Sequence, residues 1–156
     1  DLGEVRHLVN QYRKELARIR LMKENLSTKS KQQLTESQTA TIDEFVKYAC
    51  KNLGIQNPPR NLTFSYDNDA AKEKRSFGYF DPNSNKIWVY VKNRNMADIL
   101  RTLAHELVHY HQHITGVHGN GETGSPTENE ANVRSAIMMR NFDYDHPDVF
   151  KLPPIE

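Results

Sequence analysis

Two histidines one helical turn apart carry the strongest chemical signal in the sequence. His105 and His109 frame the pattern H-E-x-x-H, with Glu106 directly after the first histidine. On a helix, residues i and i+4 share one face, so both imidazoles can bind the same metal ion. Glu106 is rotated by about 100° from His105, which places it beside the metal rather than on it. A zinc ion bound there would acidify water, and Glu106 could take the proton as a general base.

A third zinc ligand must come from elsewhere in the chain. His113 continues the same helix, but a third ligand from one straight helix would hardly complete a tetrahedron. His118 does not stand at the spacing of H-E-x-x-H-x-x-G-x-x-H. Glu128 and Glu130 follow on the next predicted helix and point about 160° apart, so at most one of them faces the metal. Because Glu128 shares its face with small side chains that allow close helix packing, we predict Glu128, with Glu130 and His118 as alternatives.

The H-E-x-x-H pattern followed by Glu128-x-x-Ala131-Asn132 resembles the gluzincin class of zinc metallopeptidases. The resemblance covers residues 77–140, and the run 123–132 is similar to small metallopeptidases of tailed phages and bacteria. It implies one zinc ion per chain, Glu128 as a ligand, and Asn132 as the group that orients a zinc-binding histidine. It also implies a zinc-dependent peptidase, an endopeptidase rather than an exopeptidase, with a peptide or protein substrate.

The same class implies an edge strand before the metal-binding helix that pairs with extended substrate. Residues 87–91 stand in that place, so we expect them to hold a peptide by strand addition. Trp88 and Tyr90 share one face of this strand and are either core residues or a subsite wall. A peptidase also needs a donor for the oxyanion. The first donors to test are Tyr144 and His146, and the other candidates are Tyr110, His111, His113 and His118.

Apolar periodicity predicts the elements that must position these groups. Helical spacing indicates helices over residues 4–26, 41–53, 95–114 and 125–140. Alternation indicates a strand over 62–66 and a hairpin formed by 76–80 and 87–91. Ser125 and Asn95 are the predicted N-caps of the last two helices. The segment 27–38 is polar and predicts a linker, and the proline-rich tail 143–156 predicts extended chain.

These elements favour an α+β fold. The resemblance makes it a minimal zincin-like domain with N-terminal helices, a small, mostly antiparallel sheet, the H-E-x-x-H helix and a following Glu-bearing helix. We expect an N-terminal helix with a polar linker over residues 1–38 and the zincin-like metallopeptidase domain over 39–156.

Composition limits the partners. The chain of 156 residues has 21 basic and 20 acidic side chains and a net charge of +1. This balance predicts no strong, non-specific binding to nucleic acid or to an anionic membrane. The single Cys50 excludes an intrachain disulfide framework and a cysteine-rich zinc site. No apolar run approaches the roughly 20 residues of a membrane span, and no secretory signal is visible. We expect a cytoplasmic protein, or a virion-associated one if the chain is phage-encoded.

Two alternative functions remain open from the sequence. One is a catalytically silent zinc protein with a structural or regulatory role, for example in a virion, whose site is closed by His113 or His118 as fourth ligand. The other is a SprT-like DNA-associated metalloprotease, supported by Gly116-x-His118-Gly119 and opposed by the near-neutral charge. The basic helix at residues 4–26 is either a solvated surface or an arm that binds a protein partner.

Overall fold

The computed structural model describes residues 1–31, 33–117, 119 and 124–156, and for residues 21–31 it describes the backbone alone. The chain forms two units, Asp1–Leu34 and Thr35–Glu156. The first unit contains helix α1 (Leu2–Lys31), which extends beyond the predicted helix at both ends. No helix among the described residues combines the length and apolar character that crossing a membrane requires.

The polar segment 27–38, predicted as a linker, is helical over 27–31 and 36–38, and the boundary between the two units falls within it, after Leu34. α1 continues to Lys31, and α2 (Glu36–Leu53) begins before its first apolar residue. Thr35 caps α2, since its Oγ1 accepts from the Gln38 backbone at 3.1 Å while Gln38 Oε1 accepts from the Thr35 backbone at 2.9 Å. This reciprocal box satisfies two backbone N–H groups at the helix start, which allows α2 to start early.

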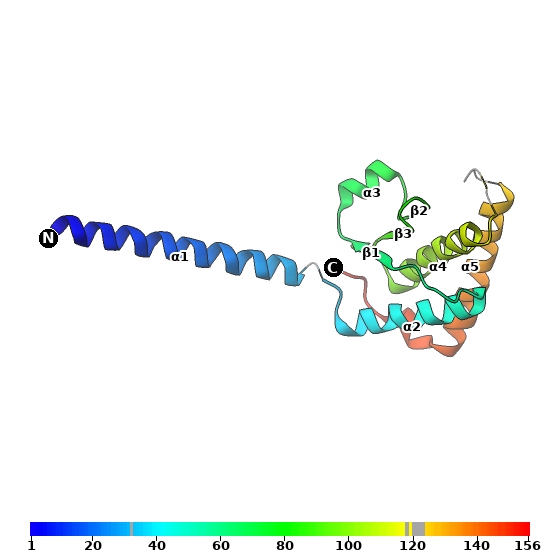
Figure 1. Cartoon of the computed structure of the whole chain (residues 1–156). Helices are drawn as coiled ribbons and strands as arrows, with labels where there is room; N and C mark the ends of the chain where they lie inside the picture. Colours follow the sequence, from blue (N-terminus) through cyan, green and yellow to red (C-terminus); the bar gives the residue numbers. More distant parts are fainter. Residues whose placement is uncertain (32, 118, 120–123) are drawn as a thin grey trace. The chain divides into compact units, whose positions relative to one another are not determined.

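The second unit is an α+β domain, as predicted, and its central element is α4. Its elements are α2, β1 (Asn61–Ser65), α3 (Asn68–Lys74), β2 (Gly78–Asp81), β3 (Lys86–Tyr90), α4 (Met96–Ile114), α5 (Pro126–Asp145) and the 3-10 helix η1 (Pro147–Lys151). α4 lies between the sheet and α2, and α5 packs along it (Figure 1). Ile99, Leu103 and Leu107 of α4 are fully buried. Asn95 occupies the N-cap position of α4, but its side chain makes no capping hydrogen bond.

The three-stranded sheet is mixed rather than mostly antiparallel. β3 is the central strand, antiparallel to β2 as the predicted hairpin requires and parallel to β1. The parallel pair arises because the chain passes through α3 and β2 before it returns beside β1. The expectation that residues 87–91 offer a free edge is therefore wrong, and the edge strand beside α4 is β2. Trp88 and Tyr90 are buried and pack with Ala71 of α3, so they are core residues.

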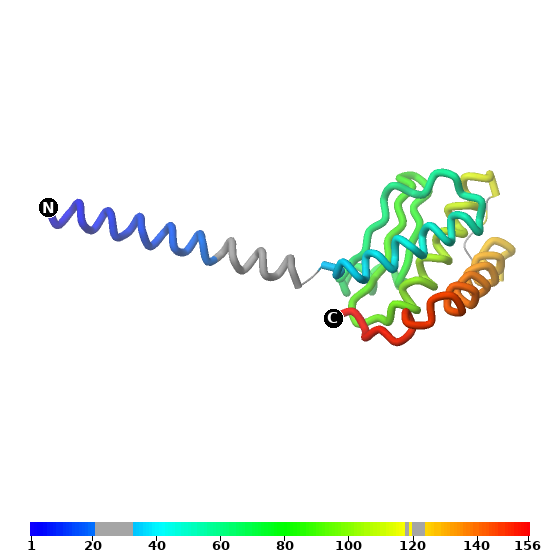
Figure 2. The backbone as a smooth tube through the Cα atoms, turned by 90° about the horizontal axis from the view of Figure 1, so that it is seen from below, coloured from blue at the N-terminus to red at the C-terminus, as the bar shows by residue number. Residues whose placement is uncertain are grey.

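The C-terminal segment is also more structured than its prolines predicted. α5 continues to Asp145 because Met138 and Phe142, both fully buried, extend its apolar face. After η1 the chain runs back toward the start of α2 (Figure 2). Ile155 is buried, its carbonyl accepts from the Asn93 backbone at 2.6 Å, and its own N–H donates to the Arg94 carbonyl at 3.0 Å. These bonds attach the tail just before α4.

Candidate metal centre

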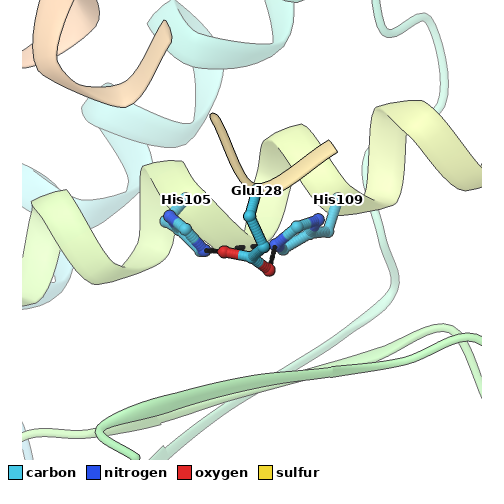
Figure 3. A group of neighbouring side chains, drawn as sticks. All are labelled: His105, His109 and Glu128. Carbon is cyan, nitrogen blue, oxygen red and sulfur yellow. Dashed lines mark hydrogen bonds and ion pairs between the residues drawn. The ribbon is translucent and has the colours of Figure 1, made fainter. Parts of the chain in front are cut away.

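Three side chains from two helices converge on one point. His105 and His109 project from α4 toward Glu128, which stands in the first turn of α5 (Figure 3). His105 Nε2 lies 3.1 Å from Glu128 Oε2, and His109 Nε2 lies 2.8 Å from Glu128 Oε1. The two Nε2 atoms are 3.1 Å apart. In a tetrahedral zinc site with bonds of about 2.0–2.1 Å, donor atoms lie about 3.3 Å apart. The donor types and their spacing therefore fit one zinc ion.

Glu128 reaches this point because α5 begins where the sequence predicted. Ser125 is the N-cap, its Oγ accepts from the Glu128 backbone at 3.3 Å, and Pro126 occupies the first turn. Ala131 and Ser135 are buried on the following turns. Their small side chains let α5 approach α4 closely, as expected for the face that Glu128 shares.

One of the two alternative third ligands can be placed, and it lies apart from the cluster. Glu130 does not join the three-donor cluster. Its Oε1 accepts a hydrogen bond from Gln112 Nε2 at 3.1 Å instead. His118 lies outside the described residues. Among the described residues, Glu128 is thus the glutamate that the fold brings to the two histidines.

Gln112 is a residue of the site that the sequence pattern did not single out. It is buried, and its Nε2 donates to the Thr127 carbonyl at 2.9 Å as well as to Glu130. Both partners are acceptors, so the amide cannot be turned around. Gln112 Oε1 therefore faces His109 Nδ1 at 2.9 Å and accepts its proton. A neutral His109 protonated on Nδ1 presents the lone pair of Nε2 to the metal position.

His105 has a neighbour of its own on α5. Asn132, one turn after Glu128, is close enough to influence the pKa of His105, and it stands at the position that the resemblance implied for an orienting residue. The pKa of His105 is lowered chiefly by burial and then by the neighbouring His109, while Glu128 and Asn132 act in the opposite direction. Burial thus favours the neutral imidazole that a metal ion needs.

Glu106 lies beside the cluster but does not belong to it. It is buried, and this burial, with the charge of Glu128 as a second cause, raises the pKa of its carboxyl to about 8. Gly78 of β2 makes room for it. A Cβ on Gly78 would clash with Thr102 Cγ2 and would stand 3.3 Å from Glu106 Cγ. The glycine therefore lets the backbone of β2 approach α4 at this turn.

A cleft of ≈ 500 Å³ opens over the cluster. A second cavity of ≈ 350 Å³ adjoins it and includes Asn132 and Arg101. Residues that line both cavities are Ser76, Gly78, His105 and Glu106. The two hollows therefore meet at the carboxyl of Glu106 and the edge strand β2.

The two oxyanion donors predicted first, Tyr144 and His146, do not line this cleft. Tyr144 is 87% exposed, and His146 stacks on Phe142 with ring centroids 4.1 Å apart while its Nε2 lies 2.9 Å from Glu44 Oε1. Tyr110 donates to the Asn57 carbonyl at 2.9 Å, and His111 does not line the cleft. Of the described candidates, only His113 lines it, and Tyr79 of β2, which the sequence analysis missed, lines it as well.

No protein-family model matches this chain, and no curated protein and no solved structure shows significant similarity to it.

Proposed function

We propose that the protein is a zinc-dependent peptidase in which His105, His109 and Glu128 hold the metal and Glu106 is the general base. The observation that carries this proposal is the position of Glu106, a buried carboxyl beside a convergent His-His-Glu cluster at the base of a cleft. When bound, zinc would lower the pKa of water and polarise the scissile carbonyl.

The surroundings of Glu106 suit proton transfer. A carboxyl whose pKa lies near the working pH can accept a proton from water and later donate it to a leaving amine. Burial keeps this group out of bulk water, and in the metal-free site burial and the Glu128 carboxylate both raise its pKa. A bound zinc ion would offset the charge of Glu128 and favour the carboxylate form that acts as the base. The backbone of β2 at Gly78 also passes close to Glu106, with no side chain between them.

The edge strand β2 supports a peptide as substrate. β3 pairs with one edge of β2, so the other edge of this strand does not belong to the sheet. An extended peptide could add to such an edge through main-chain hydrogen bonds. Because the two cavities meet beside β2, a chain lying along the strand would pass over Glu106 and extend into both.

A catalytic zinc site differs from a structural one in its number of protein ligands, and His118, one of the two fourth ligands considered from the sequence, lies outside the described residues. Structural zinc sites are closed by four protein ligands, whereas catalytic sites keep one position open. In the portion of the chain that the structure describes, the cluster contains three donors. His113, a possible fourth ligand in the sequence, packs against Phe80 with ring centroids 5.7 Å apart.

The test combines metal analysis with a cleavage assay of the wild type and Glu106→Gln on a broad peptide library. We expect about one zinc ion in both proteins and cleavage only by the wild type, because the amide keeps the shape but cannot accept the proton. Cleavage that persists in the variant would sink the role of Glu106. X-ray absorption showing four protein ligands would instead indicate a closed structural site.

A further inference from the structure

The first unit exposes an apolar stripe with heptad spacing. Leu2, Val9 and Leu16 are seven residues apart, and each is followed three residues later by another apolar side chain, namely Val5, Tyr12 and Ile19. These are the a and d positions of a coiled coil. All six are exposed, from 37% for Leu16 to 77% for Leu2.

This stripe lies along one continuous helix, α1 (Figure 1). Helices gain most of their stability in water from packing an apolar face rather than from their own hydrogen bonds. A long helix whose apolar a and d side chains are exposed would therefore be stabilised by packing against a second helix with the same spacing.

The charges beside the stripe indicate which partner fits. Along residues 1–20, arginines occupy the three e positions: Arg6, Arg13 and Arg20. The g positions hold Asp1, Leu8 and Glu15. In a parallel pair, each g residue faces the e residue five positions further along the other helix, so Asp1 would face Arg6 and Glu15 would face Arg20 of the second copy. An antiparallel pair would instead set arginines against arginines.

We propose that α1 pairs with α1 of a second copy of this chain in a parallel, two-stranded coiled coil. Bundles of three or four helices would bury Arg6, Arg13 and Arg20, which favours two strands, although Leu16 at a with Ile19 at d would by themselves favour more. Glu15 forms an ion pair with Arg18 of its own helix, but this exposed contact contributes little in water and does not oppose pairing with the second copy. This pairing goes beyond the proposed peptidase function and does not depend on the metal site.

The mass of the full chain in solution tests the pairing. Sedimentation equilibrium of the wild type with EDTA present should give twice the 18.1 kDa of one chain as concentration rises. Val9→Asp with Leu16→Asp places charges in the seam and should leave monomers. Asn10→Asp with Ala17→Asp adds the same charges on the outer face and should leave the dimer intact. A wild type that stays monomeric, or a trimer or tetramer, would overturn the proposal, as would a dimer that survives the seam charges.

Cross-linking tests the direction of the two helices. In a Cys50→Ala background, Val9→Cys places the two thiols next to each other only in a parallel pair in register. Lys14→Cys, at an outer f position, is the matched control. Oxidation should link the Val9→Cys chains rapidly and the Lys14→Cys chains hardly at all. A dimer by sedimentation whose Val9→Cys chains fail to link would exclude the parallel arrangement.

Discussion

The ring of His109 donates from Nδ1 to Gln112 Oε1 over 2.9 Å, and this bond has only one possible direction. The amide nitrogen of Gln112 is held by two acceptors, the Thr127 carbonyl and the Glu130 carboxylate. The tautomer of a candidate zinc ligand on α4 is thus set by groups on α5. Glu130 contacts the site through Gln112, although it stands outside the three-donor cluster.

Gln112→Met should weaken zinc binding by about 10- to 100-fold, the range typical for loss of a group that orients a metal-binding histidine. Methionine has a similar volume but offers no strong acceptor to His109 Nδ1. Competition against a chromogenic chelator measures the affinity.

The control exchanges the two polar partners. Gln112→Glu alone places a second carboxylate beside that of Glu130, and the repulsion between them should weaken zinc binding. Adding Glu130→Gln restores a donor opposite an acceptor and should recover much of the affinity. A double variant no better than Gln112→Glu alone would argue against the Gln112–Glu130 bond as the coupling between them.

Comparing Glu128→Gln with Glu130→Gln tests which of the two glutamates binds the metal. Glu128→Gln removes the anionic donor and should reduce bound zinc well below one per chain, because an amide is a poor zinc ligand. Glu130→Gln should retain about one zinc. Metal content after dialysis against a weak chelator distinguishes the two, and the reverse result would assign the third ligand to Glu130.

Gly78→Ala should destabilise the domain by about 1–3 kcal/mol, the usual cost of an added group in a tightly packed place. The new methyl group would meet Thr102 and Glu106, so peptide cleavage should fall as β2 moves away from α4. Urea unfolding of the metal-free protein measures the first effect. Gly3→Ala, whose Cβ would meet only the Asp1 side chain at 3.7 Å, is the control. Equal stability of both variants would contradict the close approach.

Tyr79→Phe and His113→Ala test which group on the cleft wall donates to the oxyanion. Loss of a donor that contacts it should lower kcat by about 10²–10³-fold without changing zinc content. Tyr144→Phe should have no effect, since Tyr144 is almost fully exposed. A large loss of kcat in Tyr144→Phe, with no loss in the other two variants, would support Tyr144, which the sequence analysis proposed as the donor.

The pair of His146 and Glu44 should make stability depend on pH. The hydrogen bond to Glu44 raises the pKa of His146. Its contribution is therefore fully present below the unfolded pKa of about 6.5 and is lost as pH rises through the higher folded pKa. Glu44→Gln should lower the free energy of unfolding at pH 6 by less than about 1 kcal/mol and leave it unchanged at pH 9. Asp43→Asn, on the same helix, should show no such pH dependence.

The three-residue cluster proposed to bind metal could be predicted because its members depend on local spacing. H-E-x-x-H fixes two histidines on one helical face, and the cap at Ser125 fixes the phase of α5, so Glu128 follows from the small residues on its side. Gln112 could not be found in this way. It stands three residues after His109, within reach on the helix, but its orientation depends on a carbonyl and a carboxylate of another helix.

Errors in the fold prediction arose where distant parts of the chain meet. The parallel pairing of β1 with β3 leaves no mark in either strand's own sequence. Likewise, Phe142 becomes a core residue through packing against Phe45 and Tyr48 of α2, with ring centroids 5.0 and 5.6 Å apart. That packing extends α5 and turns His146 toward Glu44 instead of the cleft.

Gly78 also bears on how this site could be inherited. A side chain at this position would collide with α4, so any descendant that keeps the arrangement should keep the glycine, although it takes no part in the chemistry. The same reasoning applies to Ala131, which is fully buried on the close-packed side of α5. Related proteins should therefore be recognised by four features together rather than by H-E-x-x-H alone. These are a glycine on the edge strand, the H-E-x-x-H pattern, a glutamine three residues after it, and a following helix that begins with Glu-x-x-Ala.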